Sequence, residues 1–144
     1  MIDVVALAAG FAADLGAAIE NCGREEDLRD VLPFVELVGD GAAERIDAAV
    51  EFARGGTSTS TFASERTLGC YRVTALRAEA VAALARFDDL ALPALYRAVA
   101  LRHGETSVSP RLAGEIRGLV ILCRCAIANG WQVLAIASDR SQAT

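Results

Sequence analysis

The sequence predicts an all-α fold: one domain of five or six helices packed in a bundle-like arrangement. Hydrophobic residues make up 53% of the 144 residues, and the surplus is mostly alanine, the residue with the highest helix propensity. Proline occurs three times and aromatic residues make up 6%, so residues typical of strands and breaks are few. The length suits a single domain, which we expect to span residues 1–144 with a flexible loop near 55–63.

Three helices are expected in the first part of the chain. The first covers about 3–21 and ends near Gly23, and the second covers about 25–38 with a kink or restart at Pro33. The third, over 42–54, is the most clearly amphipathic one. Its apolar face is formed by Ile46, Ala49, Val50 and Ala53, and its acidic face by Glu44, Asp47 and Glu51.

The second part predicts three more helices. One covers about 64–87, because apolar residues recur there at helical spacing, and the next begins near Asp88 and ends at His103-Gly104. Ser109-Pro110 is the clearest helix start in the sequence, and its helix continues to about Asn129-Gly130.

The tail from Trp131 to Ala137 allows two interpretations. We expect the helix to continue past Gly130. The alternative is a strand, for which only the segment Ile2–Ala6 offers an eligible partner.

Charge and composition exclude several function classes. The net charge is −5 and all 14 basic residues are arginine, so lysine-dependent sites such as the P-loop and the Schiff-base lysine are absent. An acidic chain without a basic stripe predicts no binding to nucleic acid. The apolar stretch 118–137 could pass for a membrane span, but Arg124, Asn129 and Gln132 favour a helix inside a water-soluble domain.

The cysteines and the single histidine give little support for a cofactor. Cys22, Cys70, Cys123 and Cys125 fall in stretches read as apolar helices, which predicts reduced thiols buried in the core and no metal site. His103 is expected to stabilise the end of its helix. The run from His103 to Pro110 before a long apolar helix resembles the proximal corner of a globin, which would imply a haem ligand. Too little chain follows Pro110 for two full-length globin helices, so we expect no cofactor.

Several polar residues are candidates for binding. The acidic stripe Glu44, Asp47 and Glu51 could steer a basic partner, although a solvated helix face explains it equally well. Arg117 and Arg124 are seven residues apart on the most apolar helix, and they face either water or a carboxylate or acidic ligand. Arg111 and Glu115 are expected to form a minor surface pair.

The function we expect is binding to another protein, as a non-enzymatic regulator, adaptor, or immunity- or antitoxin-like inhibitor in the cytoplasm. The first residues lack the basic stretch with which a secretory signal begins, so we expect no such signal. Gly114 and Gly118 on the apolar helix further predict a homodimer. The alternative is a pocket protein that binds or rearranges a small apolar ligand, with Tyr71, Tyr96, His103 and Arg124 as its polar groups.

Overall fold

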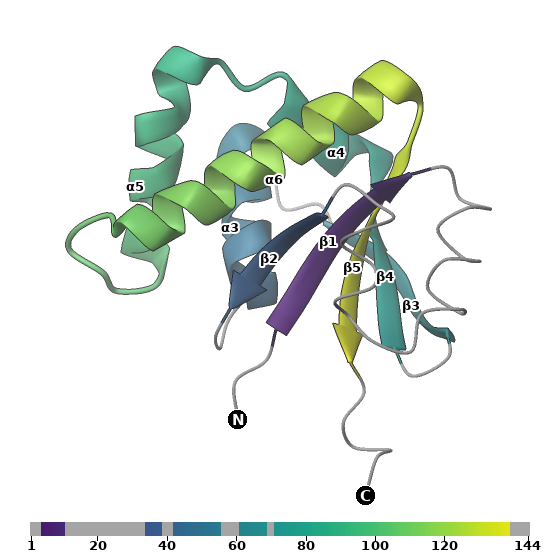
Figure 1. The fold of residues 1–144 in the computed structure, drawn as a ribbon. Helices are drawn as coiled ribbons and strands as arrows, with labels where there is room; N and C mark the ends of the chain where they lie inside the picture. Colours follow the sequence, from purple (N-terminus) through teal and green to yellow (C-terminus); the bar gives the residue numbers. More distant parts are fainter. Residues whose placement is uncertain (1–3, 11–33, 39–41, 56–60, 69–70, 139–144) are drawn as a thin grey trace, which may run out of the picture.

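The computed structural model shows a mixed α/β fold, so the all-α bundle predicted above is wrong. It describes residues 4–10, 34–38, 42–55, 61–68 and 71–138. Their elements follow in the order β1 (Val4–Gly10), β2 (Phe34–Val38), α3 (Ala42–Ala53), β3 (Phe62–Leu68), β4 (Tyr71–Leu76), α4 (Ala78–Ala85), the 3-10 turn η1 (Asp89–Ala91), α5 (Leu92–Arg102), α6 (Pro110–Asn129) and β5 (Gln132–Ser138) (Figure 1).

The five strands form one antiparallel sheet in the order β2-β1-β5-β4-β3. The C-terminal strand β5 lies in the middle, where Ala135 pairs with Leu7 of β1 and Ile136 pairs with Val73 of β4. The first and the last strand of the described chain therefore pair with each other, although more than 120 residues separate them.

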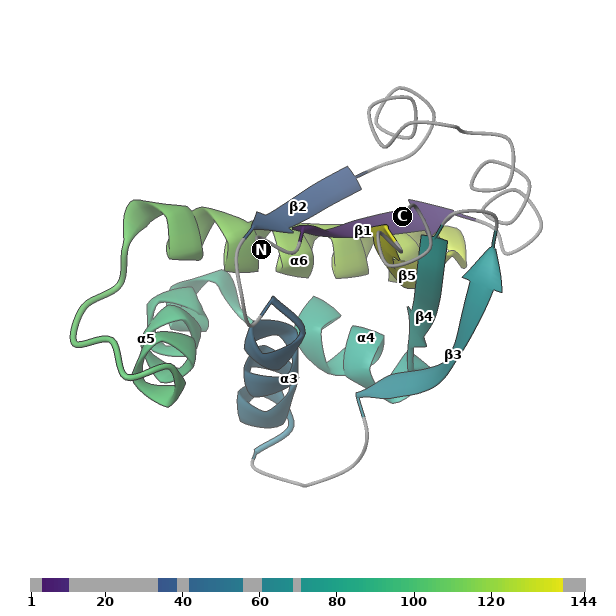
Figure 2. The ribbon, with the colours of Figure 1, turned by 90° about the horizontal axis from the view of Figure 1, so that it is seen from below.

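The described helices gather on one side of the curved sheet. Figure 2 shows α3, α4 and α5 on the same side of β1 and β2, while β4 and β3 turn out of the plane of β1 toward these helices. Helix α6 runs beside β1 and β2 and packs most extensively on α4.

One core fills the space between the sheet and the helices. It includes Leu7 and Ala9 of β1, Val133 and Ala135 of β5, and the inner residues of all four described helices. On β5, Leu134 and Ile136 point to the opposite face of the sheet and are also buried, with 1% and 2% of their surface exposed. Strand β5 is thus buried on both faces.

Three expected helices are corrected. The first helix, expected over 3–21, contains β1, and the second, expected over 25–38, contains β2; their remaining residues, 11–33 among them, lie outside the described part. Of the helix expected over 64–87, only α4 is helical, and β3 and β4 occupy the rest. The tail 131–137 is strand β5 rather than helix. One of its two neighbouring strands is β1, which overlaps the segment Ile2–Ala6 named above as the eligible strand partner.

Other expected boundaries are confirmed. Helix α3 covers nearly the expected residues, and α6 begins after Ser109, whose Oγ accepts a hydrogen bond from the Leu112 N–H at 3.1 Å. Gly130 ends α6 with φ +69°, a conformation that favours glycine. Within the described ranges, no helix has both the length and the apolar composition to cross a membrane.

Candidate functional site

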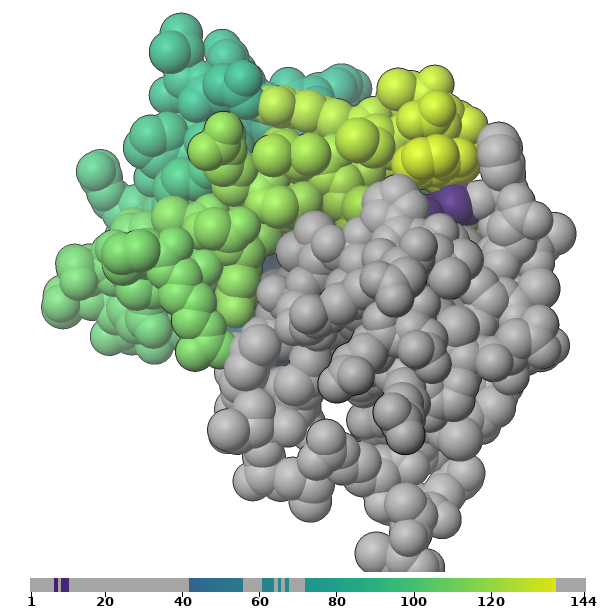
Figure 3. All heavy atoms as spheres, viewed as in Figure 1, coloured from purple at the N-terminus to yellow at the C-terminus, as the bar shows by residue number. Residues whose placement is uncertain are grey.

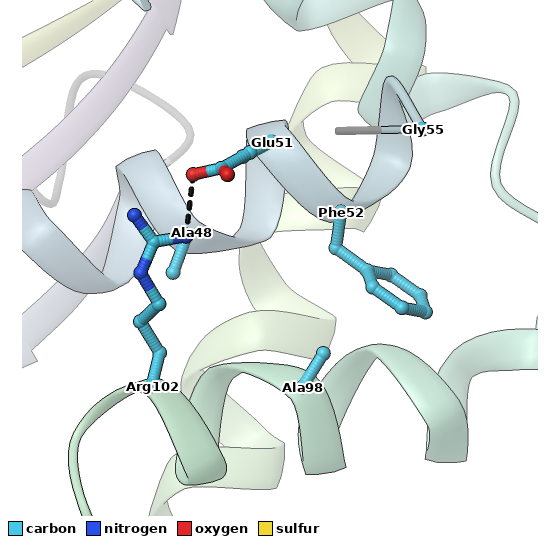
Figure 4. Close-up of a pocket in the computed structure, with 6 residues that line it drawn as sticks. All are labelled: Ala48, Glu51, Phe52, Gly55, Ala98 and Arg102. Atoms are coloured by element: carbon cyan, nitrogen blue, oxygen red, sulfur yellow. Dashed lines mark hydrogen bonds and ion pairs between the residues drawn. The ribbon is translucent and has the colours of Figure 1, made fainter. Parts of the chain in front are cut away.

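A shallow groove lies between α3 and α5. It has a volume of about 290 Å³ and is lined by Ala48, Glu51, Phe52, Gly55, Ala98 and Arg102 (Figure 4). Two alanines, one from each helix, form its floor. Because neither side chain extends beyond Cβ, the two helices leave a space there that a larger residue would fill.

The two sides of the groove differ chemically. On one side, Glu51 of α3 and Arg102 of α5 form an ion pair, with 36% and 53% of their side chains exposed. On the other side, Phe52 projects from α3 toward α5 (Figure 4) and is 42% exposed. Its ring also contacts the ring of Phe87, with centroids 6.0 Å apart. The groove thus presents an apolar floor and an aromatic wall beside a charged rim.

The local sequence explains how these side chains reach the surface. The core face of α3 consists of Ile46, Ala49 and Val50, which are fully or almost fully buried. Phe52 follows two positions after Val50, so the helical rotation of about 100° per residue carries it off that face. Gly55, at φ +75°, then ends the helical segment beside the groove.

The three acidic candidates on α3 have different surroundings. Asp47 accepts a hydrogen bond from the buried hydroxyl of Thr61, which ties α3 to the start of β3. Glu51 pairs with Arg102, and Glu44 is exposed. Asp47 and Glu51 therefore each connect α3 to another element. Of the three carboxylates, only Glu51 lines the groove.

Arg124 and Arg117 lie on the same helix but in different environments. Arg117 is an exposed residue of α6, the helix coloured light green in Figure 3. Arg124 is 34% exposed and its NH1 lies 2.7 Å from Oδ1 of Asp89. It also donates from Nε to the Ala85 carbonyl at 3.4 Å and from NH2 to the Phe87 carbonyl. Arg124 thus fastens the end of α4 and the following turn to α6.

His103 and Tyr96 lie on α5 but do not line the groove. His103 is the exposed C-cap of α5, directly after Arg102. Tyr96 is half-buried and packs against the core. Tyr71 lies in β4, and none of Tyr96, His103 and Arg124 lines the groove.

Glu115 of α6 is buried and contacts two arginines, whereas the sequence predicted one. The expected pair of Arg111 and Glu115 is present, with Arg111 at the surface, but Glu115 is only 9% exposed and is therefore buried rather than a surface group. Its carboxylate lies 3.4 Å from Arg111 and also 3.3 Å from Arg45 of α3. The contact with Arg45 could not be predicted from the sequence, because seventy residues separate the two partners.

The two described cysteines differ in exposure, which corrects the expectation that all are core thiols. Cys123 is fully buried in α6, whereas Cys125 is exposed, and neither forms a disulfide. Burial raises the pKa of Cys123 from 9.0 to about 12, because the charged thiolate would lose its hydration. Cys22 and Cys70 lie outside the described residues. In the ranges that the structure describes, no three His, Cys, Asp or Glu side chains gather as a metal site.

The structure places Gly114, one of the two glycines that predict a homodimer, at the surface of α6. Gly114 is exposed, and a Cβ added there would meet nothing within 4 Å. It therefore mediates no close approach of another described helix.

Comparison with known proteins finds no family model, no curated protein and no solved structure that matches this chain. The function must therefore be argued from the groove and its surroundings alone.

Sequence reasoning missed Phe52, Ala98 and Arg102. A signal for Phe52 was present, because an aromatic residue off the core face of an amphipathic helix is exposed by helical geometry. For Arg102 there was none, since Glu51 is 51 residues away.

Proposed function

We propose that this protein is a non-catalytic, cytoplasmic protein-binding domain, and that the α3–α5 groove receives an apolar side chain from its partner. The observation that carries the proposal is the combination of the groove's alanine floor with the exposed ring of Phe52. Interfaces between proteins commonly centre on such a pocket, into which one large side chain is inserted.

The surface around the groove supports this proposal. Leu101 of α5 is 63% exposed and stands three residues after Ala98. The helix that forms one side of the groove thus carries a further exposed apolar side chain. Polar groups at the rim, here Glu51 and Arg102, set the orientation of a partner more than they add affinity.

A small-molecule pocket is the second candidate, and the size of the groove is the observation that bears on it. Pockets for small ligands measure roughly 300–1,000 Å³ and bury most of the ligand, whereas this groove has about 290 Å³ and a rim of half-exposed side chains. These dimensions suit one inserted side chain better than a whole ligand. The resemblance to globins presupposed an all-helical chain, and the five-stranded sheet removes that basis.

Site-specific photo-crosslinking tests the proposal. A photoreactive phenylalanine analogue is placed at Ala98 in the groove and, as a control, at Ala128, an exposed alanine on α6. We expect the Ala98 probe to give a discrete protein adduct that the Ala128 probe does not give.

The adduct's partner is then identified by mass spectrometry, purified, and titrated against the wild type and the Ala98→Trp and Ala128→Trp variants. Filling the groove should weaken binding by about tenfold or more, an energy typical of a central contact, while Ala128→Trp leaves it unchanged. Equal crosslinks from both positions, or equal affinity of both variants, would overturn the proposal.

A further inference from the structure

The turn before α5 presents an unusually exposed apolar side chain. Leu90 of η1 is 91% exposed, the highest value among the exposed large apolar residues of the described chain. An isolated exposed leucine is common on protein surfaces and needs no explanation by itself. What distinguishes Leu90 is the rigidity of the turn that carries it.

Three contacts hold this turn in place. The Asp88 carboxylate accepts a hydrogen bond from the Leu90 N–H at 3.1 Å, and the Asp88 carbonyl accepts one from the Ala91 N–H at 2.9 Å. Arg124 pairs with Asp89 between them. A side chain on a turn fixed in this way loses little conformational freedom when it binds, which favours it as an interface anchor.

The anchor directly precedes α5, the helix that forms one side of the groove. Within α5, Ala94, Ala98 and Arg102 follow one another at intervals of four residues, the spacing of the ridges by which helices pack together, and Leu90 stands four residues before Ala94 in the adjoining 3-10 turn. Eight residues separate Leu90 from the groove floor at Ala98, about 12 Å along a helix axis. Ala94 stands midway and is exposed, so its small side chain would let a second helix approach closely.

Charge along this segment favours an antiparallel partner of the same sequence. Asp88 and Asp89 directly precede Leu90, and Arg97 stands beside Ala98. Asp89 is already paired with Arg124, and Arg102 with Glu51, so the charges that this segment offers to a partner are Asp88 and Arg97. Two copies of α5 side by side in opposite directions would bring Asp88 of each copy toward Arg97 of the other.

We propose that the occupant of the groove is a second copy of this chain: Leu90 of each copy enters the α3–α5 groove of the other, about a two-fold axis near Ala94. This inference rests on the groove's proposed function as a side-chain receptor and names its partner. The interface is of the isologous kind, in which the same patch on both subunits supplies anchor and groove.

Sedimentation equilibrium of the full chain between about 1 and 200 µM tests the inference. We expect a monomer–dimer equilibrium in the wild type that is weakened by about tenfold or more in Leu90→Asp and in Ala98→Trp. Ile127→Asp, a substitution of an exposed apolar residue on α6, should leave the dimer unchanged. Leu90→Asp alters a solvent-exposed position, so its fold should be retained, and its thermal unfolding curve checks this.

Mixing the two weakened variants gives the decisive measurement. In a mixed dimer, the intact Leu90 of the Ala98→Trp chain meets the intact groove of the Leu90→Asp chain, which restores one of the two contacts. The mixture should therefore dimerise more strongly than either variant alone.

Three results would overturn the inference: a wild type that is monomeric at 200 µM, a Leu90→Asp variant that dimerises normally, or a mixture no stronger than its parts. A mass that grows beyond two chains would overturn the two-fold arrangement. A monomeric wild type whose groove still crosslinks a foreign protein at Ala98 would refute self-association and leave the proposed function standing.

Discussion

Replacing Arg124 by methionine should destabilise the domain by about 2–3 kcal/mol. The ion pair with Asp89 contributes at most about 1 kcal/mol, because 73% of the Asp89 side chain is exposed. The larger part comes from the hydrogen bonds to the carbonyls of Ala85 and Phe87, since a bond from a charged donor is worth about 1.5–3 kcal/mol. The Ala85 contact is long, at 3.4 Å, and adds little.

This value is smaller than the roughly 3–5 kcal/mol lost when a fully buried pair is broken, because Arg124 is itself 34% exposed. Methionine keeps much of the aliphatic stem, so the change removes mainly charge and donors.

Urea denaturation, followed by circular dichroism, measures the free energy of unfolding. Arg117→Met is the matched control on the same helix, and its exposed position predicts a change within about 0.5 kcal/mol. Asp89→Asn should cost about 1 kcal/mol or less. If Arg124→Met were as stable as Arg117→Met, or if Asp89→Asn cost as much as Arg124→Met, the assignment of the energy to the two carbonyls would be refuted.

Four further predictions concern buried groups. Glu115→Gln should cost about 3 kcal/mol in urea denaturation because Arg45, only 13% exposed, loses its countercharge; Glu105→Gln, an exposed control, should cost nothing measurable, and equal stabilities would contradict the burial of the pair. Iodoacetamide should label Cys125 and spare Cys123 in the native protein, as peptide mass spectrometry would show. The pKa of the Cys123 thiol rises from 9.0 to about 12 on folding, so the contribution of this thiol to stability is complete below pH 9 and is lost as the pH rises toward 12. A Cys123→Ala variant should lack this loss. Parallel stability profiles of the variant and the wild type between pH 9 and 12 would disprove the prediction. Ile136→Ala should cost about 3 kcal/mol, as for other fully buried aliphatic side chains, whereas Ile127→Ala, 55% exposed, should stay within about 0.5 kcal/mol; similar values for both would argue against the central position of β5.

The helices with strong end signals were predictable from the sequence. Ser109-Pro110 and Gly130 mark the two ends of α6 because a serine cap, a proline in the first turn and a glycine with positive φ each satisfy a local requirement of the helix. Pro93 falls in the first turn of α5 for the same reason. These signals act within a few residues, so no knowledge of the fold was needed.

The strands were missed because their residues imitate a helical pattern. Val73 and Leu76 are three apart, which suggested one face of a helix. In β4 they lie on opposite faces: Leu76 joins the core on the helix side, and Val73 pairs with Ile136 outside that core. Strand β4 does alternate, with Arg72 and Thr74 between Tyr71, Val73 and Ala75, but this short alternation was outweighed by the apolar residues at helical spacing that continue into α4.

Alanine added to this error in β1 and β5. Its helix propensity favours a helix over Trp131–Ala137, but propensity differences of well under 1 kcal/mol per residue are overridden by tertiary contacts. Ala135 lies between Leu7 of β1 and Thr74 of β4. A small residue is suited to this position because strands and helices meet closely around it.

The candidate site could be predicted only in its separate parts. The amphipathic pattern identified the acidic face of α3, and it also implied that the side chain of Phe52 is exposed. It could not show that Asp47 is held by Thr61, or that α5 lies beside α3 so that Arg102 meets Glu51. Which helices become neighbours is decided by the sheet on which they pack, and that sheet depends on pairing between β1 and β5, whose paired residues are about 130 positions apart. When β5 is predicted wrongly, the neighbours of each helix are therefore predicted wrongly as well. The groove on which the proposed function depends then cannot be predicted.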